Sequence, residues 1–236
     1  HQLDALLSDE KNQQLIRNKF PQEKVHRRNT GYALDYLLKM QPYNPQGESF
    51  NLCKLLAGSE GTLAFTTEIR LNLIDLPPKE IAVVCIHCNS IVEAMRANIV
   101  ALKLKPMAGE LVDKYIMDFT IGHPEYSKNR FFIEGDPAAI LMVEFMEYSH
   151  DAAKEKAEQL VSELKQQQLG FAWPILYNEQ TKYAWDVRKA GLGLLRNIKG
   201  DAQPVNLIED CAVTTDDLPA YVTDLQKVLE KHEVKA

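Results

Sequence analysis

The sequence predicts an α+β fold in two parts. After the paired prolines Pro77 and Pro78, segments with strand patterning alternate with segments of helical periodicity, whereas an apolar helix and glycine-punctuated loops precede them. Two adjacent prolines cannot continue either a helix or a central strand. We therefore expect one domain over residues 1–77 and a second domain over residues 78–236.

The composition limits the class of protein. The chain has 236 residues, of which 45% are hydrophobic and 25% charged, so it is long enough to bury a sizeable core. Its formal net charge of -6 leaves no broad basic face, which argues against a nucleic-acid partner. Apolar runs such as residues 139–143 are much shorter than the roughly 20 residues of a membrane span, and no signal-peptide pattern opens the chain. These features favour a cytoplasmic protein that acts on small molecules.

The first domain is expected to open with an amphipathic helix, because apolar residues recur at helical spacing between Leu3 and Ile16. This pattern follows at once on the first residue, which is histidine and not methionine, so we expect an internal fragment of a longer protein; a residue left over from expression is the alternative explanation of His1. Gly58 and Gly61 then punctuate an apolar, β-branched stretch over residues 55–73.

The second domain alternates strands with helices. We expect strands over residues 81–88, 140–146, 171–177 and 205–213, and helices over 91–102, around 111–119, 152–168, 181–198 and 218–231. Ser90 and Glu93 form a capping box at the start of the first helix, because each side chain can accept a hydrogen bond from a backbone N–H that the helix leaves free. This order of elements predicts a ferredoxin-like layer.

Cys85 and Cys88 have the C-x-x-C spacing of metal and redox sites, but they lie within the strand expected over residues 81–88. Positions three apart on a strand point to opposite faces, so the two thiols are not expected to share an ion. The histidines are dispersed, with no pair at helical i, i+4 spacing. No metal site is therefore predicted.

The loop between Gly58 and Gly61 is the first candidate binding site. Glycine tolerates positive φ and lets a ligand approach the backbone, and the side chains of Ser59, Glu60 and Thr62 add donors and acceptors beside the amides. Such a loop suits the phosphates or ribose hydroxyls of a nucleotide. A tight turn with no ligand is the alternative.

Longer strings around this loop resemble a known family. Arg28-Asn29-Thr30-Gly31-Tyr32 and the stretch from Phe50 to Leu63 are similar to the second half of the FAD-binding domain of vanillyl-alcohol oxidase type flavoproteins. The resemblance implies FAD in the full-length protein. It implies that the cofactor site is lined by Gly58, Ser59, Glu60, Gly61 and Thr62, with Asn29, Gly31 and Tyr32 nearby. Ala64 replaces a glycine of many members, which fits the branch with iron-sulfur clusters in other domains.

A second string, from Tyr183 through Trp185 and Arg188 to Leu192, with Glu209-Asp210 after it, resembles the cap (substrate) domain of D-lactate, glycolate and D-2-hydroxyglutarate dehydrogenases. The implied fold is the C-terminal part of a vanillyl-alcohol oxidase type FAD-binding domain followed by a ferredoxin-like cap domain. The resemblance implies that Arg188 binds the substrate carboxylate through its planar fork. A surface ion pair with Asp186 or another acidic neighbour is the alternative for this arginine.

The implied activity is oxidation of a D-2-hydroxy acid of the lactate or 2-hydroxyglutarate class, with hydride passing to FAD and electrons passing on to an acceptor. The first FAD-binding lobe and a C-terminal histidine motif are expected outside this chain, so the fragment alone should bind no FAD and be inactive, and no catalytic base is assigned. Leu192 and about Ile208 stand where the 2-hydroxyglutarate enzymes have threonine and lysine, which argues against a five-carbon diacid. A homo-oligomer is compatible with these features. The alternative function is a non-catalytic module that binds a small ligand or a protein.

Other residues have simpler interpretations. Glu110 and Asp113, on the helix expected around residues 111–119, would share a face as paired carboxylates, although a solvated face is the commoner outcome. Trp185 is expected to be a core anchor rather than a flavin contact. The charged run over residues 151–165 is expected to be the solvated side of an amphipathic helix.

Overall fold

Two units, each with its own hydrophobic core, make up the computed structural model, which describes residues 2–25, 31–195, 208 and 211–234. Unit 1 comprises residues 1–74 and 210–214, and unit 2 comprises residues 75–209 and 215–236. Among the described residues, no helix combines the length and the apolar character needed to cross a membrane.

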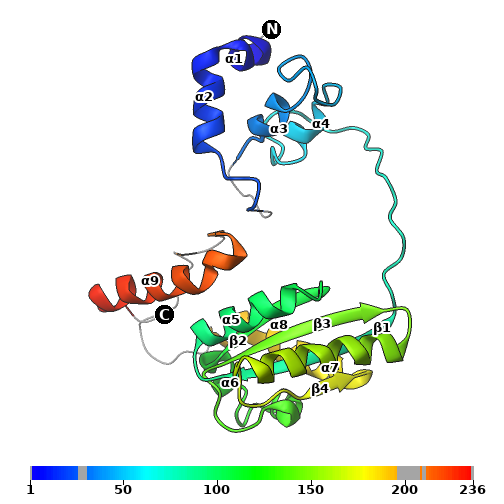
Figure 1. Ribbon diagram of the computed structural model, residues 1–236, viewed down its shortest axis with the longest axis vertical. Coiled ribbons are helices and arrows are strands. Elements are labelled where there is room, and N and C mark those ends of the chain that lie inside the picture. Colours follow the sequence, from blue (N-terminus) through cyan, green and yellow to red (C-terminus); the bar gives the residue numbers. More distant parts are fainter. Residues whose placement is uncertain (1, 26–30, 196–207, 209–210, 235–236) are drawn as a thin grey trace. The chain divides into compact units, whose positions relative to one another are not determined.

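Unit 2 is built on a four-stranded antiparallel sheet with the strand order β2-β3-β1-β4. The strands are β1 (Glu80–Cys88), β2 (Ala108–Asp113), β3 (Ala139–Glu147) and β4 (Ile175–Tyr177). Helix α5 (Ile91–Leu102) connects β1 to β2, and α7 (His150–Gln166) connects β3 to β4 (Figure 1). This order of strands and helices is ferredoxin-like, which confirms the predicted α+β class.

Both faces of the sheet are covered, and β1 contributes side chains to each. Successive residues of a strand point to opposite faces. Val84 and Ile86 therefore pack with α5 and α7, whereas Val83 and Cys85 pack with α6 (Lys114–Phe119) and α8 (Glu179–Leu195). Burial on both faces explains why β1 is almost continuously apolar instead of alternating.

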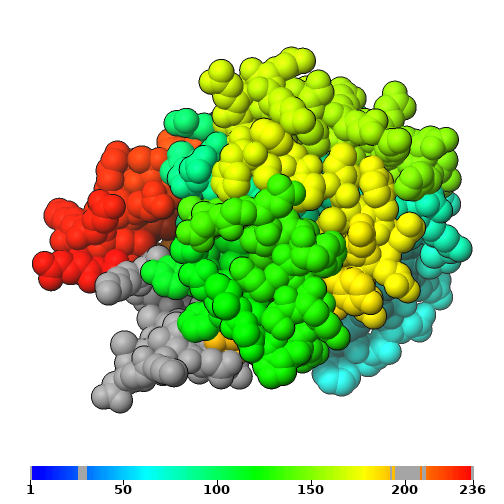
Figure 2. Space-filling model, turned by 90° about the horizontal axis from the view of Figure 1, so that it is seen from below, coloured from blue at the N-terminus to red at the C-terminus, as the bar shows by residue number. Residues whose placement is uncertain are grey.

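The helices over the first face follow the predicted patterns. The buried positions of α7 recur at helical spacing and its charged run faces water, as expected; the buried set is Ala153, Ala157, Leu160 and Leu164. Helix α9 (Leu218–Lys231) has the predicted bounds and packs against α5. It has no buried residue and stands out at the margin of unit 2 (Figure 2, red). Its packing against the core is therefore the lightest of these helices.

The capping box at α5 is confirmed with one difference. The Ser90 hydroxyl accepts the Glu93 N–H at 3.1 Å, as predicted. One oxygen of the Glu93 carboxylate accepts the N–H of Asn89, one residue before the cap, at 2.6 Å. The other oxygen accepts the N–H of Gly170 at 2.8 Å. Glu93 thus connects the start of α5 to the chain segment that leads into β4.

The helix expected around residues 111–119 is wrong at residues 111–113. Residues 108–113 form β2, in which Leu111 pairs with Leu141 of β3. Asp113 ends the strand and its carboxylate accepts the N–H of Ile116 at 2.9 Å, so that α6 begins only at Lys114. The short apolar run is compatible with a helix or a strand, and pairing with β3 selects the strand.

The strand expected over residues 171–177 is shorter than predicted. Only residues 175–177 form β4, and Ala172 makes an isolated bridge to His87. Pro174 has no N–H to donate, although its carbonyl accepts the Cys85 N–H at 2.9 Å. Pairing is continuous only beyond this proline.

The last predicted helix and strand fall partly outside the described residues. Helix α8 begins at residue 179 and covers residues 181–195 of the helix expected over 181–198, and the remainder is not described. Of the strand expected over residues 205–213, residues 205–207, 209 and 210 lie outside the described part. Residues 211–213 are not in a strand, so that end of the prediction is wrong.

Unit 1 contains short helices around a small core. They are α1 (Gln2–Ser8), α2 (Glu10–Lys19), α3 (Leu34–Leu38) and α4 (Cys53–Leu56). The single opening helix expected between Leu3 and Ile16 is wrong, because Asp9 has extended backbone and its carboxylate accepts the Asn12 N–H at 2.9 Å. Asp9 is thus the N-cap of a second helix. The core is formed by Leu7, Ile16, Leu37, Leu38, Met40 and Leu55.

Residues 63–73 form an alternating segment that carries an apolar side chain at nearly every second position. The segment contains no helix or strand, and Phe65 and Leu73 are 92% and 96% exposed. Such alternation is typical of a strand with one buried face. In the described part of unit 1, nothing covers that face.

Candidate functional site

The loop predicted to bind FAD is joined to the Gly31-Tyr32 segment by a hydrogen bond. The hydroxyls of Tyr32 and Thr62 lie 2.8 Å apart. The Thr62 hydroxyl donates its own hydrogen to the carbonyl of Ser59 at 2.5 Å, so Tyr32 is the donor of the bond between the two hydroxyls. Two predicted site segments that are 30 positions apart in the sequence therefore meet in space.

The backbone of this loop is open to a ligand. Glu60 and Gly61 have φ of 50° and 74°, in the left-handed region that glycine tolerates best. A Cβ atom placed at Gly58 or Gly61 would meet no atom within 4 Å beyond its chain neighbours, so the surface beside both glycines is open. Among the described residues, the amides of Glu60 and Gly61 meet no acceptor. Such amides suit the oxygens of an anionic group.

The side chains of the predicted FAD residues divide into two kinds. Ser59 is 5% exposed and donates its hydroxyl to the Leu56 carbonyl at 2.9 Å, so it holds the turn together. Glu60 and Thr62 are both exposed, but the Thr62 hydroxyl is already bonded to Ser59 and Tyr32. Asn29 lies outside the described residues. The described members of the predicted set therefore fit a cofactor held chiefly by backbone groups.

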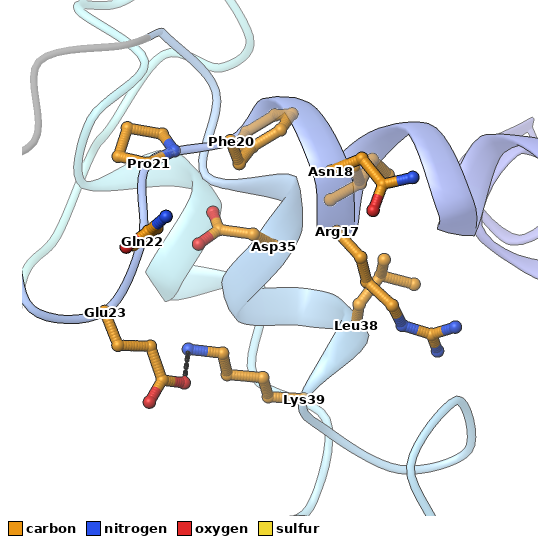
Figure 3. A pocket seen from close by; sticks show the side chains of 10 residues that line it. Arg17, Asn18, Phe20, Pro21, Gln22, Glu23, Asp35, Leu38 and Lys39 are labelled. Carbon is orange, nitrogen blue, oxygen red and sulfur yellow. Dashed lines mark ion pairs between the residues drawn. The ribbon is translucent and has the colours of Figure 1, made fainter.

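A cavity of about 500 Å³ lies elsewhere in unit 1, between α2 and α3 (Figure 3). The buried Asp35 carboxylate lies in it, and an ion pair between Lys39 and Glu23 closes one side (Figure 3). Its lining residues are Ile16, Arg17, Asn18, Phe20, Pro21, Gln22, Glu23, Asp35, Leu38 and Lys39. None of the described residues predicted to bind FAD lines this cavity, so it is separate from the glycine loop.

In unit 2, Arg188 of α8 forms an ion pair with Glu110 of β2. The Nε and Nη2 atoms of the arginine lie 3.1 and 2.8 Å from the same carboxylate oxygen, Oε2. The Arg188 and Glu110 side chains are 40% and 43% exposed, so the pair is at the surface. The acidic neighbour that the sequence left open for Arg188 is therefore Glu110, 78 residues away.

One turn earlier on α8, the Trp185 indole N–H donates to Glu144 of β3 at 2.7 Å. Trp185 is half-buried and packs on the core of this face, as its predicted role of core anchor requires. Glu110 lies opposite Met142, and Glu144 lies opposite Ala108 and Val83, so both glutamates belong to the face that α8 covers. The two contacts hold α8 against the sheet.

The predicted pairing of Glu110 with Asp113 on one helical face is wrong. Both lie on β2, where a separation of three places them on opposite faces. Glu110 contacts Arg188, and Asp113 caps α6. The signal that could have shown this was the alternation of Glu110 and Val112 towards one core, which the helical interpretation obscured.

The buried titratable groups near this face are structural. Burial lowers the pKa of His87, whose Nδ1 donates to the Cys85 carbonyl at 2.9 Å while Nε2 accepts the Glu134 N–H at 3.1 Å. Both nitrogens are thus engaged and inaccessible, so His87 is not a catalytic base. Burial also raises the pKa of the Cys85 thiol, and that of Cys88 to about 12, so both thiols stay protonated. They lie in the two different cores, as predicted.

The fold and these contacts agree with a family match. Residues 77–236 match the family model described as FAD linked oxidases, C-terminal domain, and the chain belongs to that family. Curated relatives include D-2-hydroxyglutarate dehydrogenases of Pantoea ananatis (29% identical, covering 93% of this chain and 22% of the relative) and of Escherichia coli (29%, covering 93% and 22%). The corresponding enzyme of Pseudomonas putida is also 29% identical, covering 92% of the chain and 21% of the relative. The chain thus spans about a fifth of the length of these relatives.

Proposed function

We propose that this chain is part of an FAD-dependent dehydrogenase that oxidises a D-2-hydroxy acid to the 2-oxo acid. The observation that carries the proposal is the family match over residues 77–236, because that family is defined by its link to FAD. Bound FAD would accept the hydride from C2 of the substrate. The same proposal includes an electron acceptor, an iron-sulfur cluster elsewhere in the protein and a cytoplasmic location. Its support is Ala64, which stands where many members of the resembled family have glycine, and the acidic composition.

The proposal gives unit 1 the role of holding the cofactor. Residues 1–77 would be the C-terminal part of an FAD-binding domain, and residues 78–236 the cap domain. The loop from Gly58 to Thr62 supports this, because its amides and open surface suit the polar part of a dinucleotide. The alternating segment (residues 63–73) supports it as well, since its bare apolar face calls for further chain to pack against.

Arg188 is the residue proposed to bind the substrate carboxylate. A guanidinium pairs two N–H donors with two carboxylate oxygens, which orients C2 as well as attracting charge. Its side chain is 40% exposed on α8, so an anion can reach it from solvent. The substrate class stays at D-2-hydroxy acids. The relatives act on D-2-hydroxyglutarate by name, whereas Leu192 departs from the threonine that the resemblance predicts for such enzymes.

Flavin reduction tests the proposed function. The purified full-length protein should be yellow, and anaerobic addition of D-lactate or D-2-hydroxyglutarate should bleach the oxidised flavin. The L-enantiomers serve as controls, because C2 carries a single hydrogen, and a site that fixes the carboxylate and the hydroxyl would point the hydrogen of the L-enantiomer away from the flavin. A folded full-length protein without flavin would instead support the non-catalytic binding module.

The Arg188→Lys variant tests the proposed substrate contact. Lysine keeps the charge but not the planar fork. We expect the full-length variant to keep its flavin and its unfolding midpoint, and to lose at least about tenfold in kcat/KM, equivalent to about 1.4 kcal/mol of transition-state binding. Wild-type kinetics would reduce Arg188 to a member of a surface ion pair.

A further inference from the structure

The ion pair with Glu110 uses two of the five N–H donors of the Arg188 guanidinium. A guanidinium has a side edge, formed by Nε and Nη2, and an end edge, formed by Nη1 and Nη2. Glu110 occupies the side edge, because both Nε and Nη2 donate to its Oε2 atom. In the described part of the chain, Nη1 meets no acceptor. The end edge can therefore bind a second carboxylate while Glu110 stays in place.

We infer that Glu110 is a positioning residue, which holds the guanidinium of Arg188 side-on so that its end edge is presented to the carboxylate of the substrate. The inference rests on the proposed substrate role of Arg188. Arg188 then binds Glu110 and the substrate at the same time, whereas the sequence presented the ion pair and the substrate contact as alternatives. Glu110 acts through Arg188 and does not touch the substrate.

The strand position of Glu110 suits this role. It lies within β2, whose backbone is paired with β3, so its Cα cannot move far without disrupting the sheet. Arg188 has a long side chain with several rotatable bonds, so without a partner its guanidinium would sample many positions. Two donors converging on one oxygen of a carboxylate that is anchored in the sheet remove much of this freedom before any ligand binds. A preorganised donor pair binds its partner with a smaller loss of entropy.

The sign of the kinetic effect separates positioning from simple electrostatics. Glu110 carries a negative charge beside an arginine that is proposed to bind an anion. If charge alone mattered, removing Glu110 would strengthen anion binding and lower KM. If Glu110 positions the guanidinium, removing its charge loosens Arg188 and raises KM.

The test uses the full-length, flavin-loaded protein with a dye acceptor and with D-2-hydroxyglutarate and D-lactate as the probes. Glu110→Gln keeps the size of the side chain and removes its charge. We expect KM to rise about fivefold or more for the better of the two probes, with kcat changing less, since charge-assisted hydrogen bonds are roughly twice as strong as neutral ones. Glu110→Asp, which restores the charge, should recover part of the loss.

The matched control is Glu147→Gln. Glu147 of β3 also pairs with a helix cation, Lys156 of α7, but on the opposite face of the same sheet. Both variants should shift the unfolding midpoint slightly, because ion pairs that remain partly exposed to solvent contribute little. Only Glu110→Gln should change KM. Equal kinetics in the two variants, or a lower KM in Glu110→Gln, overturns the inference.

A double variant checks that Glu110 acts through Arg188. In an Arg188→Met background, Glu110→Gln should cause no further loss in kcat/KM, whereas additive losses would mean an independent role and overturn the inference. If Arg188→Met itself leaves kcat/KM unchanged, the proposed substrate role of Arg188 fails. If Arg188→Met lowers kcat/KM and Glu110→Gln does not, only the positioning role fails. If Arg188→Met abolishes turnover, the comparison of Glu110→Gln with Glu147→Gln decides.

Discussion

The two units differ in how completely they cover their apolar surfaces. Unit 2 packs helices on both faces of its sheet, and the side chains of β1 beyond its first two residues are buried. In the described part of unit 1, six residues form the buried core, and the alternating segment (residues 63–73) is exposed. Unit 2 thus has the features of an independently stable layer. In unit 1, the apolar face of the alternating segment is one that the described residues do not cover.

Two phenylalanines give the largest contrast. Phe145 is 1% exposed in the core of unit 2, and Phe65 is 92% exposed in the alternating segment. Phe145→Ala should lower the free energy of unfolding of this chain by about 3–5 kcal/mol, because it leaves a cavity. Phe65→Ala should change it by less than about 0.5 kcal/mol. Urea unfolding of both variants measures these values.

The same Phe65→Ala change in the full-length protein sharpens the comparison. If the rest of an FAD-binding domain covers the alternating segment, Phe65 becomes a core residue there, and the loss should rise to about 3 kcal/mol. An equally small loss at both lengths would show that the segment is exposed in the whole protein, and would contradict the proposed incompleteness of unit 1.

The buried His87 should make the stability of unit 2 depend on pH. Burial lowers its pKa in the folded chain below the ordinary value of about 6.5, so the unfolded chain binds a proton that the folded chain resists. The stabilising contribution is therefore complete above about pH 6.5 and is lost as the pH falls below it, by at most about 1.4 kcal/mol per pH unit. Urea unfolding between pH 7.5 and pH 5, roughly the window set by that pKa, should show this slope.

His87→Gln should remove that part of the slope, although the variant is itself less stable. His232→Gln is the control, because His232 is exposed at the end of α9 and lies outside the core that buries His87. A slope that persists without His87 would assign the pH dependence to other groups.

Helix caps offer a smaller and matched comparison. Ser90 caps α5 in unit 2 and Asp9 caps α2 in unit 1, each accepting one backbone N–H. Each change to alanine should cost about 1 kcal/mol of local stability. Ser90→Ala should lower the unfolding midpoint of unit 2, while Asp9→Ala should reduce helix content by circular dichroism without moving that midpoint. A shift of the unit 2 midpoint by Asp9→Ala would mean that the two units unfold together.

Glu60→Ala should have the smallest effect on stability. Its side chain is exposed on the loop, so the free energy of unfolding of this chain should change by less than about 0.5 kcal/mol. In the full-length protein the same change should reduce the flavin retained per polypeptide, measured by absorbance after gel filtration. Unchanged flavin content would show that Glu60 does not contact the cofactor.

Local sequence patterns determined much of the fold and some of the candidate site. The capping signal at Ser90 and Glu93, the periodicity of α7 and the bounds of α9 are properties of neighbouring residues, so they could be predicted without knowing the rest of the chain. The strand position of Cys85 and Cys88 likewise predicted that their thiols point to opposite faces. The glycine loop was predicted from its residue types, because the ability of Gly61 to adopt a positive φ is a local property.

Tertiary structure decided the features that depend on distant partners. Residues 108–113 became a strand because β3 supplied a partner for a short apolar run that suited a helix as well. The acidic partner of Arg188 was undetermined in the sequence, since Glu110 is 78 residues away and reaches it only when α8 packs over β2 and β3. Local patterns determine what a segment can become, but the contacts that complete a site form between segments whose meeting depends on the whole fold.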